Sequence, residues 1–377
     1  MKKNLTKLFA LLLVLAMITV MFAGCKGNDE PTDPSNSDAS TEPSSEATEK
    51  HENKVIYGSD TELSGDLGNA WWTNNATDKL IRDLINDYDV IMFDQFGQMK
   101  VNETVSDGVQ TAENEDGTAT YTVKIKQGLT YNDGTPITAA DYVAYMLVQF
   151  SPATLEAGAT VSSDTVVGGN EYQNGESKVL AGLRLLDEYT YSISITPDYA
   201  NYYYGLTYAS LSPLYLPLYS SAALTVKDDG EGAYLDGGEL KADEINASRY
   251  VYENRVTAGP YVIKSIDTGA LTATLEINPN YAGNFEGQKP SIQTIVVVKS
   301  EDDSKMDAFT TGEITFLSQL SEGDQIKTAL ELVDSGKYNY CHYTRNGYGK
   351  IQFQCDGGPT QFQAVRQAVA YLLHREE

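Results

Sequence analysis

The chain has few of the residues on which most catalytic and metal sites depend. Its 377 residues include only three histidines, three cysteines and two tryptophans. No Cys or His spacing matches a zinc site, and the sequence has no Gly-x-Ser-x-Gly elbow, Walker loop or metal-binding His pair. We therefore expect a protein that is not an enzyme, with no catalytic residues, no metal site and no cofactor.

Basic residues are also scarce. The chain has 27 Lys and Arg against 53 Asp and Glu, which gives a formal net charge of -26. Nucleic acid is bound through clustered Lys and Arg, so this charge balance excludes nucleic acid as a partner. In an exported protein such acidity favours solubility. The 41% of hydrophobic residues indicates a globular chain.

The cysteines are Cys25, Cys341 and Cys355. Their spacing leaves two alternatives for Cys341 and Cys355, which either pair in an oxidising compartment or remain half-buried thiols. His342 follows Cys341 directly, and adjacent residues of a strand point to opposite faces. We therefore interpret these two neighbours as strand residues and not as a Cys-His dyad.

The start of the chain has the layout of a secretory signal. Lysines near the terminus precede an apolar run over residues 8–22, and small residues follow at Ala23 and Gly24. The run is shorter than the about 20 residues of a membrane-spanning helix, which disfavours an uncleaved anchor. Residues 1–24 are therefore predicted to be a signal peptide. Residues 26–53 are almost all polar or acidic, and so are expected to form a disordered tether.

The ending Phe22-Ala23-Gly24-Cys25 resembles the lipobox of bacterial lipoproteins, in which the cysteine is acylated and becomes the first residue of the mature protein. This resemblance implies lipidation of Cys25 and a tether of residues 25–53. Acyl chains contribute about 0.8 kcal/mol per buried methylene, which is enough for several chains to hold a protein at a membrane. We expect an extracytoplasmic protein, anchored on the outer face of the cell membrane or in the periplasm.

Apolar periodicity predicts strands and helices that follow one another along the mature chain. One apolar run suits a strand buried on both faces. A turn at Asp267-Thr268-Gly269 predicts a hairpin. The predicted strands are 55–58, 121–126, 189–196, the hairpin 261–263 with 271–278, and the apolar run 295–298; the predicted helices are 78–88, 142–150 and 365–373. This mixture indicates an α/β (mixed α+β) fold with mixed sheets.

The clearest local unit lies between Tyr121 and Phe150. A strand with one solvent-exposed face is followed by the tight turn Asn132-Asp133-Gly134. Thr138 and Asp141 then resemble a capping box, placed directly before a helical stripe of apolar residues. Strand, turn and capped helix are therefore expected in close order.

Five segments in register resemble the family 5 extracellular solute-binding proteins, which include the dipeptide and oligopeptide receptors of ABC importers. The resemblance extends from about residue 55 to residue 377. Its segments are 121–128 continuing to 132–143, Gly259-Pro260-Tyr261, Asn278-Pro279-Asn280-Tyr281, 308–314 and 365–371.

The resemblance implies a two-lobed, periplasmic-binding-protein-like fold. It implies a first lobe over residues 54–295, with an inserted subdomain at about 80–182, and the start of a second lobe over 296–377. Family members continue beyond this point, and the final amphipathic stripe has no cap, so we expect a truncated chain with an incomplete second lobe. The carboxylate that pairs with a ligand's amino terminus would lie in the absent part, so native affinity is not expected of this chain alone.

The resemblance also implies a function. We expect a monomeric lipoprotein that delivers a small molecule or peptide, above all an oligopeptide, to an ABC permease and ATPase complex. An oligosaccharide or a metal chelate remains an alternative ligand, and a cell-surface oligosaccharide-binding or adhesion lipoprotein is the alternative function.

The candidate ligand contacts come from position and from residue type. The family places contacts in the loop after the first strand and near the strand that corresponds to 343–348. Aromatic residues with polar tips also suit the walls of a binding site. The candidate ligand-binding residues are Glu62, Leu63, Ser64, Asp66, Trp71, Trp72, Tyr203 and Tyr348.

Overall fold

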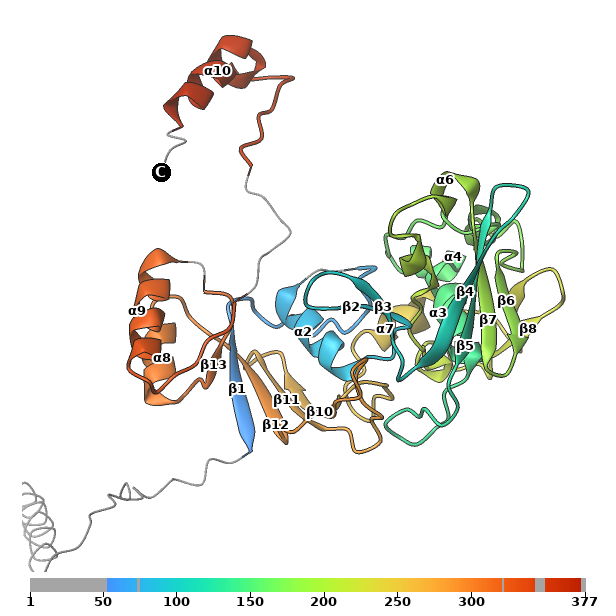
Figure 1. Ribbon diagram of the computed structural model, residues 1–377, viewed down its shortest axis with the longest axis horizontal. Coiled ribbons are helices and arrows are strands. Elements are labelled where there is room, and N and C mark those ends of the chain that lie inside the picture. Colours follow the sequence, from blue (N-terminus) through green and yellow to red (C-terminus); the bar gives the residue numbers. More distant parts are fainter. Residues whose placement is uncertain (1–52, 73–74, 321, 343–349, 374–377) are drawn as a thin grey trace, which may run out of the picture. The chain divides into compact units, whose positions relative to one another are not determined.

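The computed structural model describes residues 53–72, 75–320, 322–342 and 350–373. Predictions for the signal peptide, for Cys25 and for all but the last residue of the tether lie outside these ranges. The chain after residue 51 forms one compact unit by its internal contacts. Its strands form separate sheets that differ in strand direction (Figure 1).

A five-stranded mixed sheet contains the first strand of the described chain. β1 (Lys54–Ser59) runs parallel to β12 (Thr294–Lys299) on one side and to β13 (Phe316–Leu317) on the other. β10 (Tyr261–Asp267) and β11 (Thr272–Ile277) form the predicted hairpin, which joins β12 in antiparallel direction. The sheet order is β10-β11-β12-β1-β13. The strand at 55–58 and the hairpin are thus confirmed.

A second sheet has four antiparallel strands in the order β4-β5-β7-β6 (Figure 1). Its strands are β4 (Ser106–Glu113), β5 (Ala119–Ile125), β6 (Leu183–Asp187) and β7 (Thr190–Ile195). Alternate residues of β5 are buried, including Val123 and Ile125, because one face of the strand packs on the core. The two strands predicted around 121–126 and 189–196 are confirmed.

The helix α3 (Ala139–Gln149) packs on this sheet and begins where the sequence predicts. Thr138 and Asp141 form the capping box, in which the Asp141 carboxylate accepts a 2.8 Å hydrogen bond from the backbone N–H of Thr138. Tyr142 on the helix stacks on Tyr191 of β7 at 5.8 Å between ring centroids. The apolar stripe of α3 therefore faces the core of the sheet.

The helix α2 (Ala76–Ile85) is shorter at its end than the predicted 78–88. The side chain of Asn75 caps its start by accepting hydrogen bonds from the backbone N–H groups of Thr77 and Asp78. The chain then leaves the helix at Asn86, and Tyr88 adopts a left-handed backbone angle of φ 69°. Tyr88 stacks on Tyr281 instead of extending the helix, which shows that tertiary packing overrides the helical period there.

Gly259 brings the segment before β10 against the end of α2. Its backbone N–H donates a 2.8 Å hydrogen bond to the carbonyl of Ile85. A Cβ on Gly259 would lie 2.3 Å from the Ile85 carbonyl carbon and 2.5 Å from the Asn86 nitrogen. Only glycine permits this approach, and the approach places residues 255–258 beside α2.

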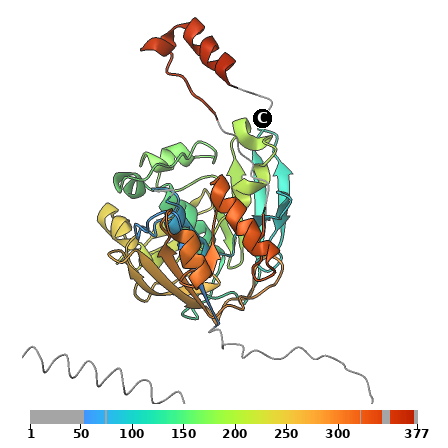
Figure 2. The ribbon, with the colours of Figure 1, turned by 90° about the vertical axis from the view of Figure 1, so that its left-hand side faces the viewer.

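Further short elements complete the described chain. Two of them, α8 (Lys305–Thr311) and α9 (Gly323–Asp334), face the viewer in Figure 2. The full set is β2 (Ile91–Phe93), β3 (Met99–Val101), α4 (Pro152–Glu156), α5 (Gly169–Gln173), α6 (Pro197–Ala200), η1 (Gly205–Ala209), η2 (Leu216–Leu218), β8 (Thr225–Asp228), β9 (Ala233–Asp236), α7 (Ala242–Ser248), α8, α9, η3 (Pro359–Gln361) and α10 (Gln363–Leu372). The last of these confirms a helix at the predicted 365–373.

Three local predictions are wrong. The run 295–298 is not buried on both faces, because Ile295 and Val297 lie in the core while Val296 and Val298 keep partial exposure. Cys341 and His342 lie outside any strand, and both are exposed. Cys341 and Cys355 are exposed free thiols, so neither of the two predicted alternatives, a pair or half-buried thiols, holds.

The predicted domain limits stay predictions. β12 crosses the limit at 295, and its residues 294–299 all pair with β1. The four-stranded sheet continues to Ile195, beyond the predicted end of the inserted subdomain at 182.

Candidate functional site

The loop from Thr61 to Trp72, called here the first loop, leaves the end of β1 and leads to α2. Asp78 in the first turn of α2 is fully buried and holds this loop. Its carboxylate accepts hydrogen bonds from the backbone N–H groups of Ser64 and Gly65, at 3.1 and 3.0 Å, and from the Ser64 hydroxyl. A carboxylate in the first helical turn is also favoured by the helix dipole. The backbone of the first loop is therefore fixed.

Asp66 anchors the middle of the first loop to a distant part of the chain. Its carboxylate oxygens lie 3.1 and 2.5 Å from Nε and Nη2 of Arg249. The backbone N–H of Gly68 donates a further hydrogen bond of 2.9 Å. Burial alone would raise the pKa of Asp66, but the hydrogen bonds from Arg249 and Gly68 outweigh it and the pKa lies below its usual value. Asp66 is therefore ionised at neutral pH.

A second arginine supports the same loop through carbonyl groups. Arg255 is 7% exposed, and its guanidinium donates to the carbonyl oxygens of Leu67 at 3.1 Å, Ser248 at 2.7 Å and Val251 at 3.0 Å. Its Nε is buried and has no hydrogen-bond partner in the described part of the chain. Arg255 thus links the first loop to the segment that follows α7.

The two tryptophans lie at the end of the first loop and differ in exposure. Trp71 is 6% exposed and packs edge-on against Tyr145 of α3, at 5.4 Å between ring centroids. Trp72 is half-buried, and the guanidinium of Arg249 lies 4.9 Å from its ring centroid. Its indole N–H donates a 3.1 Å hydrogen bond to the carbonyl of Ala157. The loop therefore ends in a fixed aromatic pair.

The candidate residues of the first loop occupy different environments. Glu62 and Ser64 are exposed, whereas Leu63 is 3% exposed and packs in the core against α2 and the five-stranded sheet. Asp66 and Trp71 are buried. The structure thus brings these residues together on one short loop, with Leu63 directed into the core.

The remaining two candidates are separate from this loop. Tyr203 is 80% exposed and contacts Tyr204, at 4.8 Å between ring centroids, in a surface cluster near η1. Tyr348 lies outside the described residues.

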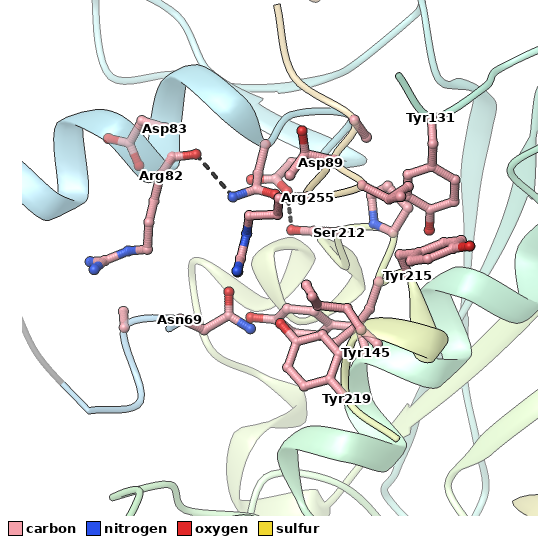
Figure 3. A pocket seen from close by; sticks show the side chains of 18 of the residues that line it. Asn69, Arg82, Asp83, Asp89, Tyr131, Tyr145, Ser212, Tyr215, Tyr219 and Arg255 are labelled. Carbon is pink, nitrogen blue, oxygen red and sulfur yellow. Dashed lines mark hydrogen bonds between the residues drawn. The ribbon is translucent and has the colours of Figure 1, made fainter. Parts of the chain in front are cut away.

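A cavity of about 300 Å³ opens beside the first loop (Figure 3). Six segments form it: the end of the first loop, α2 and the residues after it, the segment after β5, α3, the segment around η2, and the residues before β10. Its wall consists of Asn69, Ala70, Lys79, Arg82, Asp83, Asn86, Asp89, Tyr131, Tyr145, Ser212, Pro213, Leu214, Tyr215, Leu218, Tyr219, Arg255, Val256, Thr257 and Ala258. Four tyrosines and side chains of both charge signs therefore line one cavity, whose volume is at the lower end for small-molecule sites.

Asp89 is the most perturbed carboxylate on this wall. Its pKa is raised to about 6. Burial is the largest cause, the hydrogen bond that the Ser212 hydroxyl donates to Oδ1 lowers the pKa, and the negative charges of Asp87 and Asp83 raise it. The backbone carbonyl of Asp89 accepts a 3.0 Å hydrogen bond from the Asn102 side chain. The hydrogen bond from Ser212 therefore holds the carboxylate in place, but no positive charge is among the groups that shift its pKa.

Sequence reasoning missed most of the cavity wall, including Asp89, Tyr131, Ser212 and Arg255. Tyrosine was a visible signal, because the chain has 26 tyrosines. The number of tyrosines does not tell which of them share a cavity, since the four cavity tyrosines come from three segments: the loop after β5, α3 and the segment around η2.

Two structural findings bear on the class of site. The described residues contain no group of three or more His, Cys, Asp or Glu side chains placed to hold a metal ion. None of the helices in the described ranges is long and apolar enough to cross a membrane.

The family model described as bacterial extracellular solute-binding proteins, family 5 middle, matches residues 104–377. The chain therefore belongs to this family, which consists of solute-binding proteins and not of enzymes. The sequence resemblance to the family is thus confirmed. No curated protein matches the chain in sequence.

Solved structures share the fold at low sequence identity. OppA of Burkholderia pseudomallei has a TM-score of 0.53 at 14% sequence identity, and the match covers 74% of this chain and 48% of OppA. AppA of Bacillus subtilis, an oligopeptide-binding protein solved with a nonapeptide, has a TM-score of 0.51 at 19% sequence identity, and the match covers 73% of this chain and 45% of AppA. The periplasmic EDTA-binding protein EppA has a TM-score of 0.57 at 17% sequence identity, and the match covers 84% of this chain and 53% of EppA. These likenesses confirm the mixed α/β, periplasmic-binding-protein-like fold, and the chain spans about half the length of these proteins.

Proposed function

We propose that the chain is the solute-binding component of an ABC importer, which captures an oligopeptide outside the cytoplasm and presents it to a permease and ATPase complex. The observation that carries this proposal is the family match over residues 104–377. The fold shared with AppA, solved with a nonapeptide, supports the ligand class. We also propose that the protein acts as a monomer.

The first loop and the cavity beside it are the proposed ligand-contact region. Glu62, Ser64, Asp66, Trp71 and Trp72 lie on a backbone that α2 and Arg249 hold in one conformation. A fixed loop loses little entropy when a ligand binds. Backbone groups along such a loop suit an extended peptide, because main-chain pairing gives affinity with little side-chain selectivity.

Leu63 is proposed to contribute through its backbone, because its side chain is in the core. Tyr203 and Tyr348 remain predicted contacts. Ligand binding is proposed to act by closure of two lobes, since a ligand that contacts both lobes favours the closed state by its differential affinity.

The proposed location rests on the lipobox-like ending at Cys25. Growth of cells with an alkyne-labelled fatty acid tests it, because an acylated protein becomes labelled and fractionates with membranes. The Cys25→Ser variant is expected to lose both the label and the membrane fraction. A wild-type chain without label would remove the anchor from the proposal.

Mass spectrometry of small molecules that co-purify with a full-length relative tests the proposed ligand, because native affinity is not expected of this chain alone. We expect a set of short peptides that is released on denaturation and is depleted in the variant that corresponds to Trp72→Ala. An unrelated acidic protein, purified in the same way, controls for carry-over. Recovery of oligosaccharides or metal chelates in place of peptides would refute the oligopeptide assignment but not solute binding.

A surface aromatic cluster favours a second candidate function, a cell-surface oligosaccharide-binding or adhesion lipoprotein. Phe93, Tyr202, Tyr203 and Tyr204 are 49%, 53%, 80% and 41% exposed. Phe93 and Tyr203 each contact Tyr204, at 6.4 and 4.8 Å between ring centroids. Exposed aromatic faces suit sugar rings. Retention of the protein on insoluble glycans, lost in Tyr203→Ala, would support this candidate. The finding of permease and ATPase genes next to the gene for this chain would favour import instead.

A further inference from the structure

A hollow of about 910 Å³, called here the hairpin hollow, lies beside the hairpin that β2 and β3 form in Figure 1. Phe93 and Met99, which pair across this hairpin, line the hollow together with Phe96 at the hairpin tip and Phe285 of a separate turn. Phe93 and Phe96 are 49% and 78% exposed. Large apolar side chains therefore remain open to solvent on this wall.

This surface gathers most of the large apolar side chains that are exposed before residue 300 in the described chain. They number eight, and five of them belong to the hollow or to the adjoining tyrosines: Phe93, Phe96, Tyr202, Tyr203 and Tyr204. Phe93 joins the two groups, because its ring contacts Tyr204 at 6.4 Å between centroids. A contiguous exposed apolar patch of this kind marks an interaction site.

The hairpin tip holds Phe96 in a fixed turn. The carboxylate of Asp94 accepts hydrogen bonds from the backbone N–H groups of Phe96 and Gln98, both at 2.9 Å. The N–H of Gly97 donates to the carbonyl of Asp94 at 2.9 Å, and Gly97 has a φ of 72°, which favours glycine. An aromatic side chain on a fixed turn loses little entropy when a partner binds, as suits the anchor of an interface.

A second fixed turn contributes Phe285 and Glu286 to the hollow. The side-chain oxygen of Asn284 accepts hydrogen bonds from the backbone N–H groups of Glu286 and Gln288, at 3.0 and 2.8 Å. The hydroxyl of Thr104, which follows β3, donates a 2.6 Å hydrogen bond to the carbonyl of Asn284. This turn is therefore tied to the chain that leaves the hairpin.

The charged side chains of the hollow leave two carboxylates without a cation. Lys100 lines the hollow and forms an ion pair with Asp94 at 3.6 Å. Glu103 and Glu286 also line the hollow and are exposed, and neither carboxylate has an ion-pair partner among the described residues. Lys126 donates to the backbone carbonyl of Glu103, not to its carboxylate. The hollow thus combines apolar rings with an excess of negative charge.

A protein segment that carries Lys or Arg beside apolar side chains matches this surface. Aromatic residues, Met and Arg are enriched in protein interfaces. A neutral sugar would cover the rings but brings no cation for the two carboxylates, and an anionic lipid surface would be repelled by them. A second copy of this chain is disfavoured by its formal net charge of -26. Charge complementarity therefore favours a basic partner.

We propose that the hairpin hollow is a docking site for a basic segment of a partner protein. An apolar side chain of this segment packs among Phe93, Phe96 and Phe285, and its Lys or Arg side chains pair with Glu103 and Glu286. The hollow shares no lining residue with the cavity beside the first loop. The proposal therefore goes beyond solute binding and adds a second interaction surface.

Fluorescence anisotropy of a labelled probe peptide with the full chain tests this docking site. The probe Lys-Leu-Phe-Lys-Leu-Phe-Lys, blocked at both ends, carries apolar and basic side chains. The same peptide with Glu in place of Lys is its charge-reversed control. We expect the Lys peptide to bind at least about tenfold tighter than the Glu peptide. Its affinity is expected to fall several-fold as the salt concentration rises from about 50 to about 500 mM, because the two carboxylates are exposed.

Phe96→Ser tests the aromatic part of the site. This variant is expected to weaken binding of the Lys peptide at least about tenfold, because it removes the anchor at the hairpin tip. Leu186→Ser is the matched control, since Leu186 is 50% exposed on β6 and does not line the hollow. Equal affinities of the two variants would overturn the proposal. Circular dichroism of each variant checks that it is folded.

Joint replacement of Glu103→Gln and Glu286→Gln tests the charged part. It is expected to weaken the Lys peptide about fivefold and to remove most of the salt dependence. Glu113→Gln with Glu115→Gln is the matched control, because both side chains are exposed and lie outside the hollow. An equal loss in the two double variants would show that net charge alone attracts the peptide, and would overturn the docking site.

Trp72→Ala separates the docking site from the proposed ligand-contact region. Binding of the Lys peptide is expected to persist in this variant. Loss of binding in Trp72→Ala without loss in Phe96→Ser would overturn the docking site and support the proposed function. Retention on insoluble glycans that is lost in Phe96→Ser, without binding of the Lys peptide, would overturn it in favour of a sugar.

Discussion

Asp66 and Arg249, 183 positions apart in the sequence, form an ion pair with two N–O contacts of 3.1 and 2.5 Å. The side chains in this pair are 7% and 15% exposed, respectively. The pair joins the first loop to the residue that follows α7, and Arg249 also lies over the ring of Trp72. The shape of the proposed ligand-contact region therefore depends on a contact between distant parts of the chain.

Removal of Arg249 is expected to destabilise the protein. Arg249→Met leaves the Asp66 carboxylate buried without its cation, which lowers the free energy of unfolding by about 3 kcal/mol. Addition of Asp66→Asn is expected to restore part of this loss, because the unpaired charge is then absent. Urea denaturation measures both variants. Lys79→Met is the control, since its ion pair with Asp83 is 58% and 59% exposed and is expected to contribute less than about 1 kcal/mol.

Asp89→Asn is expected to stabilise the protein at alkaline pH. Burial raises the pKa of Asp89 from 3.8 to about 6, so the native state binds this proton more tightly than the unfolded state. The stability that comes from this group therefore falls as pH rises from about 4 to about 6 and stays low above that range. The variant is expected to gain up to about 3 kcal/mol over the wild type at pH 8 and little near pH 4. Urea denaturation at both pH values measures the difference, and a variant less stable than wild type at pH 8 would contradict the buried-charge explanation.

Trp71 and Trp72 are the two tryptophans of the chain, so its tryptophan fluorescence reports on the first loop. A ligand bound at this loop is expected to shift or quench the emission. Trp72→Ala removes the cation–π contact with Arg249 and the hydrogen bond to Ala157. In a full-length form it is expected to weaken ligand binding about tenfold. Calorimetry measures the affinity, and circular dichroism shows whether the fold is retained. Unchanged affinity would remove Trp72 from the contact region.

Gly259→Ala is expected to lower the free energy of unfolding by about 3 kcal/mol or more. The added methyl group would meet backbone atoms of Ile85 and Asn86 at 2.3 and 2.5 Å, which cannot move as a side chain can. Gly323→Ala is the matched control, since a Cβ there would have no neighbour within 4 Å. Urea denaturation should separate the two variants clearly. Equal stability would show that α2 can shift away from Gly259.

Local patterns predicted much of the secondary structure. The capping box at Thr138 and Asp141, the strand at 121–126 and the hairpin around 267–269 depend on neighbouring residues, and the structure confirms them. The predictions failed where long-range packing determines the local structure. Tyr88 belongs to the apolar period of α2, but its ring stacks on Tyr281 and the helix ends before it.

The sequence by itself determined the family, the order of strands and helices, and the loop after β1 as the candidate ligand region, because these follow from local periodicity and from motifs in register. Only the tertiary structure decided which side chains face one another. The partnership of Asp66 with Arg249 and the cavity of Asp89, Ser212 and the tyrosines join segments more than a hundred residues apart. Such contacts depend on how the chain folds back on itself, and no local pattern records that path.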